Sequence, residues 1–377
     1  MDPDRLTTMR LGINGWRLLA RPTGVARYLA NILSRWRPTT VFGEITVYTP
    51  AALNRGALGL PEEIRVRILA SSWRMLVWEN LRFGPQAAAD VLFCPGYSRP
   101  VLARGRTVVA THDMVHRVHP ELFPRSVRWF YSPLYGWSDK HAALVLTDSE
   151  AVKDEIVRYC AVPPEKVRVV YLAPAACFTP VTDPEILARE RVQQVGGDVP
   201  FFLFVGKITG RRSVPQLLEA FAEFRRRHTL DHRLLLVGTG TDGPELVNLS
   251  RQLGLSAVVR HAGFVPDEQL NVIYNAATAL VSSAVYETSS LPVMEAQATG
   301  LPVICLQNPG MAEITGGAAL MIDRLDQTAL ANAMIQLAED GGLRSTLRAR
   351  GLESARRFSW DRCARETMAV LEEAAAM

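Results

Sequence analysis

The chain has 377 residues, of which 48% are hydrophobic and 21% charged, a balance that indicates a soluble globular protein rather than a disordered or membrane protein. It is too long for one ordinary core, so two domains are expected. No apolar run approaches the ~18 residues that cross a bilayer, and the acidic N-terminus lacks the apolar segment of a signal peptide. The five cysteines are odd in number and never closely spaced, which predicts a reducing compartment and no structural metal site.

The net charge of +4 is unevenly distributed along the chain. Residues 1–170 contain 23 Arg and Lys against 15 Asp and Glu, a net of +8, whereas residues 171–377 contain 19 against 23, a net of −4. A basic first half indicates an anionic partner, either a lipid surface or a phosphorylated acceptor, although a solvated basic surface explains the same count. Nucleic acid is not expected, because the sequence has no recognition-helix, zinc or RNA-platform signature.

Short apolar runs alternate with helical patterns in the first half, which is typical of a mostly parallel sheet. The first strand is expected at residues 10–14, followed by a loop through residue 24 and a helix over residues 25–36. Further strands are expected at residues 44–49, 66–69, 91–94, 107–111, 143–147 and 167–171. The predicted fold class is therefore α/β.

Two residues beside these strands are candidates for ligand contact, because open α/β sheets bind ligands at the carboxyl ends of their strands. Gly24 lies at the start of the first helix, where a backbone without a side chain lets a phosphate or sugar come close. A plain turn glycine is the alternative. His112 directly follows the strand at 107–111 and is expected to position a reacting sugar through a hydrogen bond, against the alternative of a structural histidine.

The segment from Ser71 to Arg82 combines aromatic, apolar and basic residues at helical spacing. Trp73 and Trp78 lie with Arg74 and Arg82 on a predicted amphipathic helix. Such a helix can lie on a membrane interface or line an acceptor groove, and it can equally be an ordinary packed helix.

Periodicity lapses between residues 173 and 200, where prolines and adjacent glycines interrupt the pattern. We therefore predict a first domain over residues 1–172, a linker over 173–198, a second domain over 199–356 and a terminal helix over 357–377. The second domain begins with a strand at 201–205 and a helix at 214–227, and the loop between them holds Lys207, Arg211 and Arg212. Three cations before a helix N-terminus indicate phosphate binding, with Lys207 and Arg212 preferred, Arg211 as the rival and solvated cations as the alternative.

A glycine motif over residues 238–243, GTGTDG, follows the pattern of dinucleotide-binding loops. That interpretation requires an acidic residue at the end of the next strand, about 20 positions on. The strand expected at 257–261 ends instead in Arg260 and His261. We therefore expect a tight structural turn here rather than a nicotinamide site.

Two carboxylates lie near a predicted helix N-terminus in the stretch from Ala279 to Ile304. Glu287 is in a polar loop after a strand, and Glu295 lies about one turn into a helix that begins at Leu291 and stops at Gly300. A helix N-terminus attracts anions. The two carboxylates are therefore expected to hold two parts of one ligand whose phosphates lie between them.

These residues together resemble the retaining glycosyltransferases of family 4, which have the GT-B fold of two facing Rossmann-like domains with a central cleft. The most specific part, from Tyr286-Glu287 to Glu295-Ala296, is similar to the family's Glu-x7-Glu signature. Weaker similarities follow the family order along nearly the whole chain, at residues 112–113, 206–212, 263–265, 300–303, 313 and 358–360.

The resemblance implies a catalytic set of Glu287, His112, Lys207 and Arg212. Glu287 would contact the donor sugar as a positioning group rather than a nucleophile, and His112 would lie beside that sugar. Lys207 and Arg212 would neutralise the diphosphate in place of a metal ion, with Arg211 also in the donor site.

The remaining implied roles concern donor binding and domain packing. Glu295 would bind the ribose hydroxyls, and backbone amides at Ser290 and Leu291 would complete the phosphate cradle. Gly24 would close over the phosphates from the first domain. The final helix, from Trp360 to Glu372, would pack back on the first domain.

The loop after Glu287 departs from the family pattern. Thr288-Ser289-Ser290 replaces the usual Gly-Phe-Gly, so two positions lose the freedom of glycine to adopt positive φ, while three hydroxyls gain access to the sugar. The Lys207 and Arg212 pair also reverses the usual Arg and Lys order. Donor identity is the property that these changes affect most.

The resemblance implies a retaining, metal-independent hexosyltransferase that moves a hexose, mannose being favoured, to a glycan or lipid-linked acceptor in polysaccharide or glycoconjugate biosynthesis. GDP-mannose is the favoured donor, a UDP-sugar is the alternative, and no cofactor is expected. The location implied is cytoplasmic, with peripheral membrane contact through the basic first domain left open. Two other functions remain: a sugar-nucleotide epimerase, which would form product without an acceptor, and a non-catalytic nucleotide- or glycan-binding protein.

Overall fold

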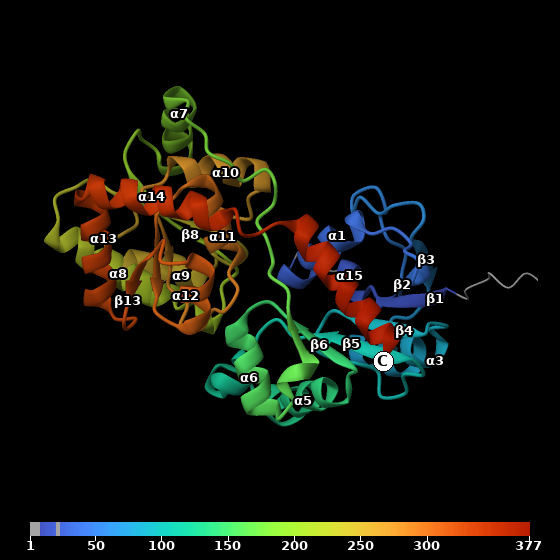
Figure 1. The fold of residues 1–377 in the computed structure, drawn as a ribbon. Coiled ribbons are helices and arrows are strands. Elements are labelled where there is room, and N and C mark those ends of the chain that lie inside the picture. The colour runs from blue at the N-terminus through green and yellow to red at the C-terminus, as the bar shows by residue number, and fades with distance from the viewer. Residues whose placement is uncertain (1–7, 20–22) are drawn as a thin grey trace, which may run out of the picture. The chain divides into compact units, whose positions relative to one another are not determined.

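The computed structural model describes residues 8–19 and 23–377, and its internal contacts divide the chain into two units (Figure 1). The first unit comprises Met1–Leu172 and Ser359–Met377, and the second comprises Ala173–Phe358. Each unit has its own parallel sheet. Residues 20–22, in the loop predicted before Gly24, lie outside the described residues.

The described part of the first unit contains a seven-stranded parallel sheet in the order β3-β2-β1-β4-β5-β6-β7. The central strands are almost entirely aliphatic and aromatic because helices cover parallel strands on both faces. The strands are β1 (Met9–Asn14), β2 (Phe42–Thr49), β3 (Arg65–Ile68), β4 (Val91–Cys94), β5 (Arg106–Ala110), β6 (Leu144–Thr147) and β7 (Val167–Val169).

In some helices of the first unit a hydroxyl caps the free amides of the first turn. Thr23 accepts a hydrogen bond from the amide of Ala26 in α1 (Gly24–Arg35), and Ser149 accepts one from Val152 in α6 (Glu150–Cys160). The other principal helical segments are α2 (Met75–Trp78), the π-helical turn η2 (Glu79–Phe83), α3 (Gly84–Gln86), α4 (Val115–Val118), the π-helical turn η4 (Val127–Tyr131) and α5 (Ser132–His141).

The C-terminal helix α15 (Trp360–Ala376) belongs to the first unit, although it follows the second unit in the sequence (Figure 1). Buried hydrogen bonds fix it to α1. The indole Nε1 of Trp36 donates to the Ala364 carbonyl at 2.9 Å, and the hydroxyls of Tyr28 and Thr367 are 3.2 Å apart. The helix also lies against β4, β5 and β6, so it covers part of the first sheet.

The second unit contains a six-stranded parallel sheet in the order β10-β9-β8-β11-β12-β13. Its strands are β8 (Phe201–Val205), β9 (Arg233–Val237), β10 (Val259–Gly263), β11 (Ala279–Ser282), β12 (Val303–Leu306) and β13 (Leu320–Ile322). Its helices are α7 (Pro184–Val195), α8 (Val214–Arg227), α9 (Pro244–Gln252), α10 (Asp267–Ala276), α11 (Leu291–Thr299), α12 (Pro309–Thr315), α13 (Gln327–Glu339) and α14 (Gly341–Ala355).

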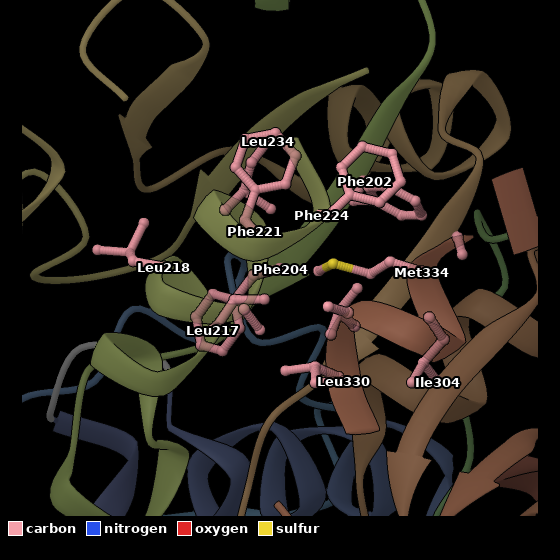
Figure 2. Packing of buried hydrophobic residues seen from close by; sticks show 14 of the residues in the cluster. Phe202, Phe204, Leu217, Leu218, Phe221, Phe224, Leu234, Ile304, Leu330 and Met334 are labelled. Carbon is pink, nitrogen blue, oxygen red and sulfur yellow. The ribbon is translucent and has the colours of Figure 1, made fainter. Parts of the chain in front are cut away.

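Phenylalanines of β8 and α8 pack among aliphatic side chains in the core on one face of the second sheet (Figure 2). Phe202 of β8 meets Phe224 of α8 with ring centroids 5.3 Å apart, and Met334 of α13 packs into the same cluster. Full burial of a side chain of this size contributes roughly 1.5–3 kcal/mol. The cluster therefore fixes β8 and the start of α8, which together hold the cationic loop of residues 206–212.

The predicted α/β fold with two Rossmann-like units is confirmed, and the predicted strand ends lie within two residues of those observed. The interpretation of residues 173–198 as a linker is wrong. Pro184–Val195 form α7, which Asp183 caps and which packs against α10, so this segment belongs to the second unit. The helix has no sustained apolar stripe, and periodicity therefore did not reveal it.

Candidate functional site

Two loops meet at the carboxyl edge of the second sheet. Strands β8 and β11 are parallel neighbours, so the loop of residues 206–212 and the loop of residues 283–290 leave the sheet side by side. Backbone contacts join them: the Val285 amide donates to the Arg211 carbonyl at 2.8 Å, and the Ser283 hydroxyl donates to the Arg212 carbonyl at 2.6 Å. This edge is where open α/β sheets bind their ligands.

The two loops bring two guanidinium groups to one buried carboxylate. Glu287 is 5% exposed, and its Oε2 lies 3.1 Å from Nη1 of Arg212. Its Oε1 lies 4.0 Å from Nη2 of Arg211. Two cations and one anion leave this cluster with a net positive charge in a poorly solvated place, where electrostatic attraction for a further anion is strong.

The structure pairs Glu287 with Arg211 and Arg212, and the expected binding of phosphate by Lys207 and Arg212 stays a prediction. Lys207 is exposed, directly after Gly206 at the end of β8. The guanidinium of Arg212 folds back over Gly206, where an added Cβ would lie 3.3 Å from its central carbon. Gly206 thus leaves the space that Arg212 occupies.

The N-terminus of α11 opens beside this cluster without a side-chain cap. Ser290 occupies the N-cap position, but its hydroxyl makes no capping bond. The hydroxyls of Ser289 and Ser290 are buried, and neither has a hydrogen-bond partner among the described residues. Buried polar groups are rarely left unpaired, and the first amides of a helix have no intrahelical partner. This helix start is suited to bind an anion.

The residues that replace the family glycines fit the loop without strain. Among the described residues, the non-glycine positions with positive φ are Tyr97, Ala161 and Ser213, so Thr288, Ser289 and Ser290 all have ordinary backbone conformations. The expected loss of positive-φ freedom therefore has no conformational consequence here. The backbone of this loop instead passes close to Gly310 of α12, where an added Cβ would lie 2.5 Å from the Cα of Thr288.

Glu295 lies on α11, on the side that faces α10. Its side chain is 1% exposed, and its Oε2 accepts a hydrogen bond of 3.0 Å from the hydroxyl of Tyr274. Tyr274 is itself fully buried. The hydrogen bond fixes the orientation of the carboxylate, and the role of Glu295 in binding ribose stays a prediction.

The glycine motif of residues 238–243 is a structural turn. A Cβ on Gly238, whose φ is +133°, would lie 2.2 Å from the Gly206 carbonyl oxygen, so only glycine lets the two loops pass this closely. The Thr241 hydroxyl donates to the Gly238 carbonyl at 2.7 Å and accepts from the Gly263 amide at 3.2 Å. These bonds close the turn and support the edge of the sheet behind Arg212.

The other two predicted site residues, Gly24 and His112, belong to the first unit. Gly24 is exposed at the first position of α1, and a Cβ there would meet no protein atom within 4 Å. No contact within the described residues requires glycine at this position. Close approach of a ligand remains the prediction for it.

His112 is engaged by the protein on both sides of its ring. Its Nδ1 lies 2.8 Å from Oδ2 of Asp148, and its Nε2 lies 3.0 Å from the Pro95 carbonyl. The Pro95 carbonyl can only accept, so Nε2 carries a proton, and a second proton lies between Nδ1 and the buried Asp148 carboxylate. Burial by itself lowers the pKa of His112, but the charge and hydrogen bond of Asp148, with the Pro95 carbonyl, raise it above its ordinary value. A sugar hydroxyl at Nε2 would have to replace the Pro95 carbonyl.

One buried carboxylate of the first unit was missed in the sequence. Glu79 is 1% exposed, and its Oε2 accepts hydrogen bonds of 3.0 Å from both Asn14 and Ser98. Burial raises the pKa of Glu79 to about 7, against the opposing effects of Ser98, Arg17 and Asn14. A carboxylate next to Trp78, on the apolar side of the predicted amphipathic helix, was the available signal.

A cavity of about 870 Å³ in the second unit lies away from this cluster. Its lining includes Pro200, Thr278 and Pro302, which precede β8, β11 and β12, so it opens at the amino edge of the sheet. Its arginines already serve the protein: Arg344 donates to the Leu337 and Ala338 carbonyls at the end of α13. The carboxyl edge remains the better site because charge and unpaired hydroxyls converge there.

Two protein-family models match the chain. Residues 188–354 match the model described as Glycosyl transferases group 1, and residues 22–173 match the model described as Glycosyltransferase Family 4. The two matches fall almost entirely on one unit each.

Curated proteins with similar sequences include two glycosyltransferases. The O-antigen chain mannosyltransferase B of Escherichia coli is 30% identical over 265 residues, which are 70% of this chain and 69% of that protein. The D-inositol 3-phosphate glycosyltransferase of Corynebacterium kroppenstedtii is 28% identical over 62% of this chain and 54% of its own length. The chain thus matches about half of the second relative.

Solved structures with the same fold cover nearly the whole chain. The crystal structure of Anabaena Alr3699/HepE in complex with UDP and glucose has a TM-score of 0.77 and 18% identity, over 96% of this chain and 99% of that one. WaaG, a glycosyltransferase involved in lipopolysaccharide biosynthesis, has a TM-score of 0.72 and 16% identity, over 96% and 99%. At such low identity the likeness shows the fold alone, which is GT-B.

Proposed function

The chain belongs to glycosyltransferase family 4, and we propose that it moves a hexose from a nucleoside diphosphate sugar to a glycan or lipid-linked acceptor. The observation that carries this proposal is the position of Arg211 and Arg212 at the carboxyl edge of the second sheet, beside the uncapped start of α11. Such a site suits a diphosphate, because two guanidinium groups and free helix amides can bind its oxygens together.

The leaving diphosphate gains negative charge as its bond to the sugar breaks. The loop bonds at Val285 and Ser283 hold the backbones of Arg211 and Arg212 in place, and the two guanidinium groups stabilise that charge once the diphosphate replaces Glu287 as their partner. A metal ion is not needed for this neutralisation. The departing phosphate can take the proton of the attacking hydroxyl on the same face of the sugar, which leads to retention of the anomeric configuration.

The other residues of the site contact different parts of the donor. Glu287 is released from its cations when the diphosphate binds them, and it then contacts the sugar. The unpaired hydroxyls of Ser289 and Ser290 bind phosphate or sugar oxygens, and Glu295, oriented by Tyr274, binds the ribose. GDP-mannose is the first donor to test, since a relative is named as a mannosyltransferase, and UDP-glucose is the second, since a complex with it exists for a protein of the same fold.

The donor assignment is tested by thermal unfolding with GDP-mannose, UDP-glucose and related nucleotide sugars. A bound donor at about 100 times its Kd stabilises the folded chain by about 2.7 kcal/mol. We expect one donor to raise the Tm, and Glu287→Ala to abolish transfer of its sugar. No shift with any nucleotide sugar, or unchanged transfer by Glu287→Ala, contradicts the proposal.

Identifying the reaction product distinguishes the proposed sugar transfer from the two alternative functions. Transfer requires an acceptor and gives a glycoside with the anomeric configuration of the donor, which NMR of the product detects. A new nucleotide sugar formed without any acceptor would identify an epimerase. Tight donor binding without any product would identify a binding protein.

We further propose that the first unit touches an anionic membrane through a surface of Trp73, Val77, Leu81, Val101 and Leu102, here called the apolar–basic surface. These side chains are between 42% and 58% exposed. A hydrogen bond of 2.8 Å from the Val101 amide to Asn80 brings the turn of Val101 and Leu102 beside the helix. Among the described helices, none has the length and apolar character of a membrane span.

Arginines give this surface its preference for anionic lipid. The guanidinium carbon of Arg82 lies 5.3 Å from the ring centroid of Trp73, and Arg74 is exposed on the same helix. Residues 65–106 contain seven arginines against two acids, of which Glu79 is buried and Asp90 is paired with Arg10. An exposed apolar surface with arginines beside it is typical of contact with anionic headgroups.

Vesicle sedimentation tests the membrane contact. We expect binding to phosphatidylglycerol vesicles, little binding to phosphatidylcholine vesicles, and loss of binding in Val77→Glu. The matched control is Val192→Glu, because Val192 is similarly exposed on the second unit. Equal binding by both variants would rule out the apolar–basic surface.

A further inference from the structure

Glu79 lies at the point where the strand order of the first sheet reverses. From β1 the chain builds β2 and β3 on one side, and then β4 to β7 on the other. The carboxyl ends of β1 and β4 therefore flank a crevice of the type in which open α/β sheets bind ligands. Asn14 ends β1, and the segment from Pro95 to Ser98 follows β4.

The carboxylate of Glu79 joins the two sides of this crevice. Its Oε2 accepts from Asn14 on the β1 side and from Ser98 on the β4 side, each at 3.0 Å. Its Oε1 is fully buried and has no hydrogen-bond partner in the described part of the chain. Glu79 opens the π-helical turn η2, a distortion that is frequent at functional sites.

A small cavity lies beside Glu79 and Arg17. Its volume is about 10 Å³, and Asn14, Arg17, Met75, Glu79, Pro95 and Gly96 line it. This is room for one water-sized group. The guanidinium of Arg17 lies against Gly96, where a Cβ would be 3.2 Å from its Nε. This Nε is likewise buried without a partner among the described residues.

Two residues that line the same small cavity thus each have one buried unpaired atom, an acceptor on Glu79 and a donor on Arg17. A hydroxyl group has one proton to donate and lone pairs to accept with, so it can satisfy both at once. Burying a carboxylate costs desolvation free energy, and a protein with an apolar side chain of similar volume in its place is often as stable or more so. Burial raises the pKa of Glu79 to about 7, which is a sign of that cost.

We propose that Asn14, Arg17 and Glu79 form an acceptor site in the first unit that binds a hydroxyl of a sugar or polyol. The hydroxyl donates to Oε1 of Glu79 and accepts from Nε of Arg17, while Asn14 and Ser98 hold the carboxylate in place. This site rests on the proposed glycosyl transfer, for which it supplies the recognition of the second substrate. Trp16 and Tyr97, both half-buried, flank the same loops and can contact the apolar face of the ring.

Saturation-transfer NMR with methyl α-D-mannopyranoside as the probe tests this site without requiring turnover. Glu79→Gln keeps the size of the side chain and an oxygen for Asn14 and Ser98, but it places an amide donor where Oε1 accepted. We expect the probe signal of the full-length chain to fall about tenfold in Glu79→Gln. In transfer assays the acceptor KM should rise by a similar factor, while the Kd of the nucleotide sugar stays unchanged.

Asp139→Asn is the matched control, because Asp139 is also a fully buried carboxylate of the first unit and is bonded to Thr111 at 2.7 Å. We expect it to leave the probe signal intact. Equal probe signals from the wild type and a folded Glu79→Gln, or none from the wild type, would mean that the cavity holds only water and would overturn the site. Nucleotide-sugar binding measured on the same samples keeps this outcome separate from failure of the proposed function.

Discussion

Glu287 shows how a carboxylate can be buried beside a site that is built for anions. Its two neighbours, Arg211 and Arg212, compensate its charge, and the loop bonds at Val285 and Ser283 hold both arginine backbones in place. A buried ion pair adds little net stability, since desolvation offsets most of the attraction. We therefore interpret this cluster as a site for a second anion rather than as a structural brace.

The serine hydroxyls around this cluster give a direct contrast between ligand binding and stability. Ser290 has a buried hydroxyl without a partner, whereas the Ser283 hydroxyl donates to the Arg212 carbonyl at 2.6 Å. We expect Ser290→Ala to leave the unfolding free energy unchanged or slightly higher and to weaken donor binding. Ser283→Ala should lose about 1 kcal/mol. Chemical denaturation and calorimetric titration measure both, and equal destabilisation by the two changes would contradict the assignment.

The carboxyl of Glu79 predicts a pH-dependent stability. Burial raises its pKa from an ordinary 4.5 to about 7, so the folded chain holds this proton more tightly than the unfolded chain. The stabilisation is fully present below pH 4.5 and is lost as the pH rises through about 7. Relative to the wild type, Glu79→Gln should gain roughly 3 kcal/mol in unfolding free energy between pH 4.5 and pH 8.

Urea unfolding at both pH values checks this, with Glu62→Gln as an exposed control in the same unit. A stability difference between Glu79→Gln and the wild type that does not change with pH would contradict it.

At the scale of elements, the carboxyl edge of the second sheet depends on how closely its loops pass. The turn after β9 comes within contact of the turn after β8, and Gly238 makes this possible. The loop that carries Arg212 therefore rests on a second loop, which supports it through close backbone contact. This explains a glycine-rich motif without assigning it a dinucleotide.

Gly238→Ala should consequently destabilise the second unit. Its φ of +133° is strained for alanine, and the new Cβ would overlap the Gly206 carbonyl. Gly254→Ala is the control. Gly254 has a φ of +71° with open space around it, so an alanine there is disfavoured only by its backbone conformation and meets no steric overlap. The cost of that backbone conformation is roughly 1–3 kcal/mol, and Gly238→Ala should exceed it in thermal unfolding. Equal losses would mean that the loop moves aside freely.

Sequence patterns predicted the strands well, because buried parallel strands are short apolar runs with polar ends. They also predicted that Arg212, Glu287 and the start of α11 would belong to one site, since all three follow strand ends or begin a helix. They did not predict α7, which has no apolar stripe, or the contact of Arg211 with Glu287. They also missed Glu79, whose partners Asn14 and Ser98 are distant in the sequence and meet only when β1 and β4 pair.

At the scale of the whole molecule, two units fold around separate sheets, and the chain returns to the first unit in α15. Leu371 of α15 and Leu337 of α13 are both fully buried, one in each unit. Multidomain chains commonly unfold in more than one step. Arg211, Arg212 and Glu287 all lie in the second unit, so a bound donor should stabilise that unit in particular.

Calorimetry of two matched variants tests this division. Leu371→Ala and Leu337→Ala should each cost about 2–5 kcal/mol, and each should lower a different unfolding transition. A nucleotide sugar should raise the transition that Leu337→Ala lowers. If both changes lowered a single shared transition, the two units would unfold as one.

Arg211 and Arg212 are proposed to bind the diphosphate of a nucleotide sugar. Calorimetric titration of GDP-mannose and UDP-glucose into the wild type, Arg212→Ala and the surface control Arg226→Ala tests this proposal most directly. Hydrogen bonds to charged groups are worth about 1.5–3 kcal/mol, so Arg212→Ala should weaken binding by roughly 10- to 150-fold. Arg226, paired with Glu223 on the exposed side of α8, should be neutral. Equal affinity in all three proteins would contradict the account.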